Sequence, residues 1–88
     1  MSLNVKCRIE WDQAEQEYLF VIEAEGKSVA TLIVVNVVGD LMLRRSLQLR
    51  KGHNEFRLPG FNNLESGTYG YRLMYTAKRT ISGMLTKR

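Results

Sequence analysis

Few side chains in this chain could take part in acid–base, nucleophilic or metal chemistry. Its 88 residues contain one histidine, His53, and one cysteine, Cys7. A metal site needs several His, Cys or carboxylate ligands, and catalysis needs acid, base or nucleophilic groups that converge on one point. Glu23 and Glu25 share one face of an expected strand, where solvent-facing charges are the simpler interpretation. We therefore expect no enzyme activity, no metal site and no cofactor.

The single cysteine also rules out an internal disulfide. Cys7 lies in an alternating apolar run, so we expect a buried core thiol; the other inward positions of this run are Val5, Ile9 and Trp11. The longest apolar run, residues 29–38, is about half as long as a transmembrane helix. Residues 1–8 lack the apolar segment of a signal peptide, and residues 1–3 fit a cloning remnant. We expect no membrane insertion.

Charge is spread unevenly along the chain. Residues 1–27 carry three Lys/Arg against six acids, whereas residues 28–88 carry ten against three. A basic half can indicate a nucleic-acid partner. Here the cations alternate with apolar residues along expected strands, no aromatic residue interleaves with them, and no glycine-rich phosphate loop occurs. We interpret them as a solvated face and expect no nucleic-acid binding.

The apolar pattern divides the chain into short strands separated by turn signals every eight to twelve residues, which is typical of an all-β domain. Residues 12–16 are a polar loop or one helical turn, and residues 59–63 form a loop between sheets because Pro59 cannot donate to a central ladder. We predict one domain over residues 1–88, an immunoglobulin-like or fibronectin-like antiparallel β-sandwich. Its seven expected strands are residues 5–11, 17–24, 28–38, 41–50, 54–58, 68–77 and 80–87.

The residues around the sixth expected strand carry the most specific local pattern. Its apolar side chains fall at every second position, which places them on one face; they are Tyr69, Tyr71, Leu73 and Tyr75. Gly67 suits a backbone position with positive φ. We expect the Tyr69 hydroxyl to bond back over the preceding loop, which Leu64 and Gly67 shape, as a tyrosine corner does.

Two expected strands are apolar on both faces. If residues 17–24 and 28–38 neighbour each other, one face of each would form an exposed apolar patch made of Leu19, Val21, Leu32 and Val34. Such a patch marks a protein interface, here with a partner domain or a second copy in a homodimer. The alternative is that other strands or side-chain stems cover it. In the next strand Arg45 interrupts the apolar series, through either a bulge at Arg44–Arg45 or a side chain that reaches the rim.

Three segments of the second half recur together in one known family. They are a valine-rich strand ending in a glycine turn at residues 33–40, the segment 47–58, and Leu64-Glu65-Ser66-Gly67-Thr68-Tyr69-Gly70-Tyr71-Arg72-Leu73. A final strand then ends in Leu85-Thr86-Lys87-Arg88. In order and spacing, residues 28–88 resemble the C-terminal sorting domain of the type IX secretion system, found on secreted and surface proteins of the Bacteroidetes. That family usually carries a Pro-Asn-Pro-like turn where this chain has Asp12-Gln13-Ala14.

The resemblance implies a non-catalytic module that ends a longer exported protein. Such a module directs an upstream cargo domain across the periplasm and through the outer membrane to the cell surface or the medium. Its partners are the secretion translocon and a sortase-like protease that removes it. By position, the resemblance assigns the sorting signal to Gly67, Tyr69, Thr86, Lys87 and Arg88, and the shape of the turns and corner to Gly39, Leu64, Gly67 and Tyr69.

Two other functions stay open at this point. A fibronectin-like adhesion or carbohydrate-binding module would share the same fold. A structural accessory domain would instead pack on an adjacent enzyme domain through the patch of Leu19, Val21, Leu32 and Val34.

Overall fold

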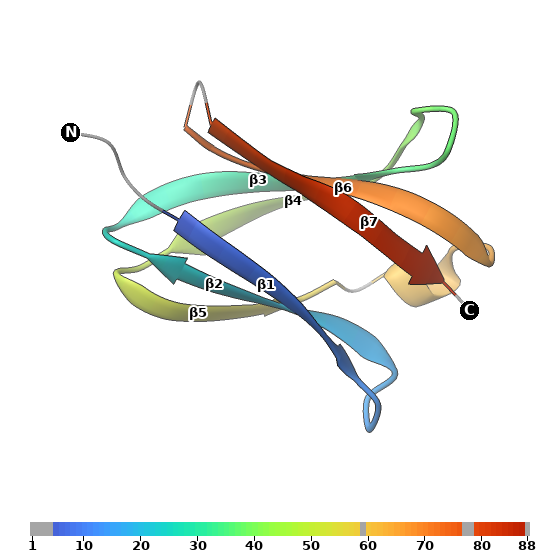
Figure 1. The fold of residues 1–88 in the computed structure, drawn as a ribbon, viewed down its shortest axis with the longest axis horizontal. Helices are drawn as coiled ribbons and strands as arrows, with labels where there is room; N and C mark the ends of the chain where they lie inside the picture. Colours follow the sequence, from blue (N-terminus) through green and yellow to red (C-terminus); the bar gives the residue numbers. More distant parts are fainter. Residues whose placement is uncertain (1–4, 59, 77–78, 88) are drawn as a thin grey trace.

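The computed structural model describes residues 5–58, 60–76 and 79–87. Seven antiparallel strands form two facing sheets, which confirms the predicted β-sandwich (Figure 1). The strands are β1 (Val5–Asp12), β2 (Glu17–Ala24), β3 (Ser28–Val35), β4 (Leu41–Leu49), β5 (Gly52–Arg57), β6 (Gly67–Thr76) and β7 (Arg79–Lys87), and a 3₁₀ turn, η1 (Phe61–Asn63), follows β5.

One sheet has the strand order β1-β2-β5, and the other has the order β4-β3-β6-β7. The fourth strand thus pairs with the third, whereas in constant-type immunoglobulin domains it joins the sheet of the first two. The chain crosses between the sheets after β5, as predicted for this segment. Pro59 itself lies outside the described residues.

The strand β3 ends three residues earlier than predicted because Asn36 starts a turn. Its Oδ1 accepts hydrogen bonds from the backbone N–H groups of Val38, at 3.1 Å, and Asp40, at 2.8 Å. Gly39 follows in this turn with φ 92°. A side-chain acceptor that serves the backbone in this way competes with strand pairing, which is why Asn favours turns.

The strand β5 begins earlier than predicted, at Gly52 rather than Asn54. Asn54 is buried, and its side-chain amide donates to the carbonyls of Ile22, Arg50 and Gly52 at 2.9–3.2 Å. Its Oδ1 accepts the N–H of Arg50 at 3.0 Å. The buried amide is therefore satisfied, which avoids the cost of about 1–3 kcal/mol for an unpaired polar group.

The core lies between the sheets and is apolar, with inward side chains from both layers. Its largest fully buried members are Phe20, Phe61, Ile22, Leu32, Leu49, Leu73 and Val34. Cys7 is half-buried and packs against this cluster, and burial raises the pKa of its thiol. Cys7 therefore packs against the core as predicted, but its side chain is only partly buried.

The predicted exposed patch is wrong for three of its four residues. Leu32 and Val34 pair with Leu73 and Tyr71 of β6 and point into the core, where they are 2% and 0% exposed. Val21 faces outward but is only 2% exposed. It lies on the central strand of its sheet, and its register partners are Arg8 on β1 and Glu55 on β5. Leu19 is half-buried.

Arg45 is exposed although it occupies an inward position opposite Leu32. Pairing is regular there, so no bulge lies at Arg44–Arg45; the irregularity falls beside Met42, where Val34 pairs with Leu43 and Val35 with Leu41. Because β4 is an edge strand, the Arg45 side chain reaches the rim, and its Nη1 donates to the carbonyl of Arg44 at 3.1 Å. An inward-pointing charge protects a sheet edge from unwanted strand pairing.

Candidate recognition site at the end of the last strand

The predicted tyrosine corner is present before β6. The Tyr69 hydroxyl donates to the carbonyl of Glu65 at 2.7 Å, and the Tyr69 side chain is buried. Gly67 has φ 150°, and the half-buried Leu64 donates its N–H to the carbonyl of Phe61 at 3.0 Å. The loop between η1 and β6 is therefore fixed from both ends, as the sequence predicted for Leu64, Gly67 and Tyr69.

A chain of aromatic rings runs from this corner to the end of β1. Phe61 meets Tyr69 with centroids 5.7 Å apart, Tyr18 meets Phe61 at 5.4 Å, and Trp11 meets Tyr18 at 4.9 Å. All three contacts are edge-to-face, with interplanar angles of 70–76°. Such pairs contribute about 0.5–1.5 kcal/mol each beyond area burial. The rings hold this end of the sandwich in one arrangement.

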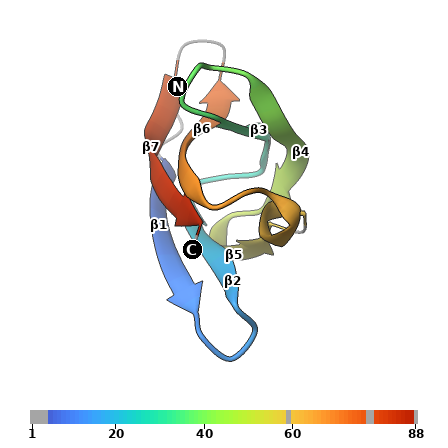
Figure 2. The ribbon, with the colours of Figure 1, turned by 90° about the vertical axis from the view of Figure 1, so that its right-hand side faces the viewer.

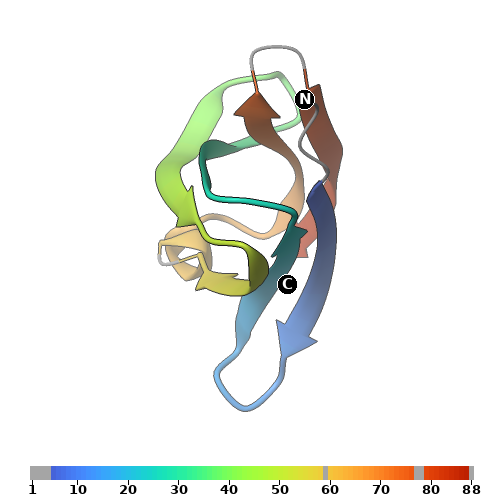
Figure 3. The same ribbon diagram turned by 90° about the vertical axis from the view of Figure 1, so that its left-hand side faces the viewer.

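The hydroxyl of Tyr18 ties the two sheets together at the end of β7. It donates to the carbonyl of Thr86 at 2.7 Å and accepts the N–H of Thr86 at 3.2 Å. Tyr18 belongs to β2 and Thr86 to β7, so the contact joins the three-stranded sheet to an edge strand of the other. Figure 2 and Figure 3 both place β1 and β7 along the same side of the molecule.

A recess of about 300 Å³ lies at this junction. Its lining residues are Trp11, Gln13, Gln16, Asn62, Thr86 and Lys87. Trp11 is 46% exposed, so its predicted place in the core is wrong. It points to the inner side of β1 but sits next to the turn at Gln13, where the sandwich ends and neighbouring strands no longer cover it.

The turn that carries Gln13 and Gln16 is held by its own side chains. Asp12 Oδ1 accepts the N–H groups of Ala14 and Glu15 at 3.1 and 3.2 Å, and Gln16 Nε2 donates to the carbonyl of Gln13 at 2.8 Å. Gln16 has φ 57°, a left-handed conformation that is strained for a residue with a side chain. The hydrogen bond from Arg57 is the main reason why the pKa of Asp12 is lowered.

The structure brings together some of the predicted signal residues. Thr86 and Lys87 line the recess beside Trp11, and Arg88 lies outside the described residues. The corner residues border a second recess of about 520 Å³; it is lined by Asn36, Val37, Met42, Asn63, Leu64, Glu65, Ser66, Gly67, Thr68 and Tyr69. Gly39 lies in the same turn as Asn36 but is not among the residues that line this second recess.

Sequence reasoning missed most of the recess. The sequence pattern places Gln13 and Gln16 in a polar loop or helical turn and Asn62 in the loop between the sheets, without marking any of them as a binding residue. The available signal was a tryptophan at the end of an expected strand, directly before the polar turn that begins at Asp12. Because tryptophan is large, it is rarely fully buried, and Trp11 at the end of its strand keeps part of its side chain exposed.

His53 lies on the outer face of the three-stranded sheet, within β5 rather than in a turn. Its Nδ1 is 2.8 Å from a carboxylate oxygen of Glu23, and its Nε2 is 2.6 Å from one of Glu55. These two hydrogen bonds, that to Glu55 first, raise the pKa of His53. Both ring nitrogens contact carboxylates, and the three side chains are each about half exposed, so the arrangement is an ion-pair bridge on the surface of the sheet.

Within residues 5–58, 60–76 and 79–87, no group of three or more His, Cys, Asp or Glu side chains is placed to hold a metal ion. No helix in that part of the chain is long and apolar enough to cross a bilayer. No protein-family model matches the chain, and no curated protein matches it either.

Proposed function

We propose that this domain is a non-catalytic secretion and sorting module that directs an attached cargo through the outer membrane to the cell surface. The translocon is proposed to bind the end of β7, and a sortase-like protease then separates the module from its cargo. The observation that carries the proposal is the position of Thr86 and Lys87. They lie in an edge strand, beside a half-exposed tryptophan and a recess.

The edge position of β7 gives a receptor backbone groups to pair with. Both polar backbone atoms of Thr86 point away from β6, because they bond Tyr18 instead. Along an antiparallel strand, the backbone N–H and C=O groups of successive residues point to alternate sides of the strand. The backbone groups of Met84, Ser82 and Thr80 therefore also face the open side, where no strand of the described chain pairs with them. An extended segment of a receptor can add to such an edge.

Charge and an aromatic anchor add specificity to this edge. From Thr68 to Arg88 the sequence contains no acidic residue and ends in Lys87 and Arg88. A cluster of one sign attracts an oppositely charged receptor and speeds the encounter. Trp11 is the kind of side chain that most often carries binding energy at interfaces. Together they make a compact recognition site.

The test is export of a reporter cargo fused in front of the domain, in a Bacteroidetes host with a type IX system. The substitutions Lys87→Glu and Arg88→Glu together, or Trp11→Ala alone, are expected to leave the cargo in the periplasm. Substitution is preferable to deleting residues 86–88, because deletion also removes the backbone groups of Thr86 that Tyr18 holds. The measurement is the fraction of cargo at the cell surface.

The matched control is Arg50→Glu with Lys51→Glu. It makes the same change of net charge at two exposed residues of the β4–β5 turn, outside the recess. This control is expected to export normally, and circular dichroism checks that every variant folds. Normal export of the Lys87/Arg88 and Trp11 variants, or failure of the Arg50/Lys51 control, contradicts the proposal.

A second candidate is a carbohydrate-binding module, and the recess supplies the observation that favours it. A tryptophan ring beside the side-chain amides of Gln13, Gln16 and Asn62 combines an apolar platform with hydrogen-bonding groups. About 300 Å³ lies at the lower end of the range for small-ligand sites. Quenching or enhancement of Trp11 fluorescence by oligosaccharides, lost in Asn62→Ala, would favour this function over sorting.

A further inference from the structure

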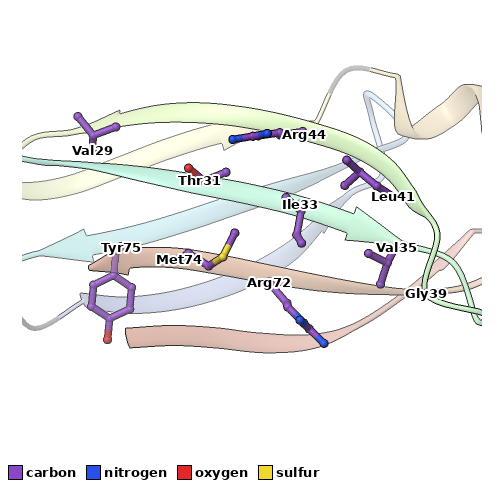
Figure 4. Close-up of a pocket in the computed structure, with 10 residues that line it drawn as sticks. All are labelled: Val29, Thr31, Ile33, Val35, Gly39, Leu41, Arg44, Arg72, Met74 and Tyr75. Carbon is purple, nitrogen blue, oxygen red and sulfur yellow. The ribbon is translucent and has the colours of Figure 1, made fainter. Parts of the chain in front are cut away.

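The outer face of the four-stranded sheet carries two neighbouring depressions, of about 770 and 260 Å³. Figure 4 shows the larger of the two. They share Val35 and Arg72, so they adjoin each other, and we call the two together the hollow; its lining comes mainly from β3, β4, β6 and β7. Gly70, which has no side chain, is among the residues that line the smaller depression. This face lies on the other side of the sheet from the core, and neither depression includes Thr86 or Lys87.

Two arginines lie on opposite sides of the middle of this hollow. Ile33 on β3 pairs with Arg44 of β4 on one side and with Arg72 of β6 on the other. Each step between neighbouring strands is about 4.8 Å, so the two arginine positions are roughly 10 Å apart, with Ile33 between them. Both arginine side chains are exposed, whereas Ile33 is half-buried.

These arginines have no carboxylate partner within the described residues. The outward positions of β3, β4, β6 and β7 contain no acidic residue at all. The outer face of the other sheet differs. There Arg8 pairs with Glu10 at 2.6 Å, and Arg57 pairs with Asp12 at 2.8 Å and with Glu17 at 3.4 Å. Its charges neutralise one another, and those of the hollow do not.

Apolar side chains surround the two arginines. Val29 is 62% exposed, Leu41 56% and Met84 67%, and Val35 and Met74 are half-buried. Exposed apolar surface grouped in this way is characteristic of protein interfaces. A partner that fits must therefore bring apolar side chains to Ile33 and Val35 and carboxylates to the arginines.

We propose that this hollow docks an amphipathic helix of another protein, with its axis across the strands and two acidic residues seven positions apart. A helix rises 1.5 Å per residue, so residues i and i+7 lie on one face about 10.5 Å apart. This spacing matches the roughly 10 Å between the Arg44 and Arg72 positions. Apolar residues at i+3 and i+4 then lie over Ile33.

The number of cations argues against two other occupants. Recognition of an anionic membrane typically takes a cluster of about 4–8 Lys/Arg. Nucleic-acid binding typically takes about 6–10 phosphate contacts. Within the described part of the chain, the outward positions in regular register on this face supply two, Arg44 and Arg72. Two arginines separated by apolar surface suit a pair of carboxylates on a protein, since guanidinium binds carboxylate in a bidentate manner. The proposal uses a different surface from the sorting site and stands or falls independently of it.

The test uses a labelled, lactam-stapled helical peptide of about 15 residues with two glutamates seven positions apart and two leucines between them. We expect saturable binding by fluorescence anisotropy. Binding should weaken about tenfold for Arg44→Glu and about tenfold for Arg72→Glu, because a charge pair becomes a repulsion. Ile33→Thr should weaken it as well, and amide spectra confirm that each variant is folded.

Two controls make the test specific. Arg50→Glu with Lys51→Glu changes the net charge equally and is expected to bind the peptide as the parent does. A peptide with its glutamates four positions apart, about 6 Å, is expected to bind about tenfold more weakly. Any of four outcomes overturns the proposal: no binding of the peptide, equal binding of the two peptides, an equal loss of binding in the Arg50/Lys51 control, or binding to phosphatidylglycerol vesicles in place of the peptide.

Discussion

At the scale of single residues, one hydroxyl group fixes the loop that leads into β6. The Tyr69 O–H donates to the carbonyl of Glu65 at 2.7 Å, and the side chain is buried. We expect Tyr69→Phe to lower the free energy of unfolding by about 0.5–1.5 kcal/mol, because one hydrogen bond is lost and its carbonyl acceptor is left partly buried. Urea unfolding followed by circular dichroism measures the change.

Tyr75 provides the matched control for that substitution. It is half-buried on the same strand, and no hydrogen bond of its hydroxyl is found among the described residues. Tyr75→Phe is expected to leave the free energy of unfolding unchanged within error. Equal effects of the two substitutions would show that the Tyr69 bond to Glu65 contributes nothing specific.

The raised pKa of His53, the only histidine, predicts how the free energy of unfolding changes near neutral pH. Glu55 and then Glu23 raise the pKa of His53 in the folded protein above its ordinary value of 6.5. The folded state therefore binds a proton more tightly than the unfolded chain does. The resulting stability is fully present below pH 6.5 and is lost as pH rises through the folded-state pKa. Denaturant unfolding from about pH 5.5 to about pH 8 should show this decline.

The variant His53→Gln removes the titrating group but keeps a polar side chain between the two carboxylates. Its stability should be nearly flat over the same pH range. The bridge is exposed, so added salt should also reduce the slope of the parent protein. A parent protein whose stability rises with pH in this window would contradict the direction of the His53 shift.

At the scale of elements, the β6–β7 hairpin depends on a glycine that faces the core. A Cβ atom at Gly83 would lie 2.7 Å from both Cε1 and the hydroxyl oxygen of Tyr71. The Tyr71 ring, which packs edge-to-face on Phe20 at 5.6 Å, would have to move. We expect Gly83→Ala to destabilise the protein by about 1–3 kcal/mol, as overpacked cores do. Thermal unfolding measures the shift.

Gly70 lies in the same hairpin and gives the opposite expectation. A Cβ atom there would meet Val35 Cγ2 at 3.4 Å, and its φ is not positive. Gly70→Ala should therefore be neutral or stabilise by about 0.4–1 kcal/mol through the unfolded state. If it destabilises as much as Gly83→Ala does, the contact with Tyr71 is not the cause of the larger effect.

The same elements show how far the sequence alone could lead. The bounds of residues 17–24 and the corner from Leu64 to Tyr69 were predicted correctly, because turn signals flank the first segment and a local motif marks the second. The inner face of β3 could not be predicted, because residues 28–35 are apolar on both faces. Pairing with Tyr71 and Leu73 of β6 decides which face is buried, and this long-range register leaves no mark in the local sequence.

The proposed recognition site was predictable only in part, for a similar reason. Thr86 and Lys87 could be singled out by resemblance, but their neighbours come from the other end of the chain. Tyr18 and Thr86 are 68 positions apart, and Trp11 is more distant still. Alternation predicted the side of β1 on which Trp11 lies. Alternation alone could not show that neighbouring strands no longer cover the position of Trp11.

At the scale of the whole molecule, one side chain joins the two sheets along the side shared by β1 and β7. The Tyr18 hydroxyl makes two hydrogen bonds to the backbone of Thr86 and so covers part of the β7 edge. Edges left open invite pairing with other strands. The sandwich is therefore closed at the end of β7 and open farther along the same strand, at Met84, Ser82 and Thr80.

We expect Tyr18→Phe to distinguish the local opening of the β7 edge from a loss of stability of the whole domain. The N–H of Thr86 loses its acceptor, so its hydrogen exchange should accelerate in two-dimensional amide spectra. Leu85 is the internal control. Its backbone N–H points the opposite way from that of Thr86, toward Tyr69 of β6, and should keep its protection from hydrogen exchange. Two lost hydrogen bonds should lower the free energy of unfolding by about 1–3 kcal/mol. Equal acceleration at both amides would mean that the substitution loosens the whole sandwich, and unchanged exchange at Thr86 would mean that Tyr18 does not close the edge.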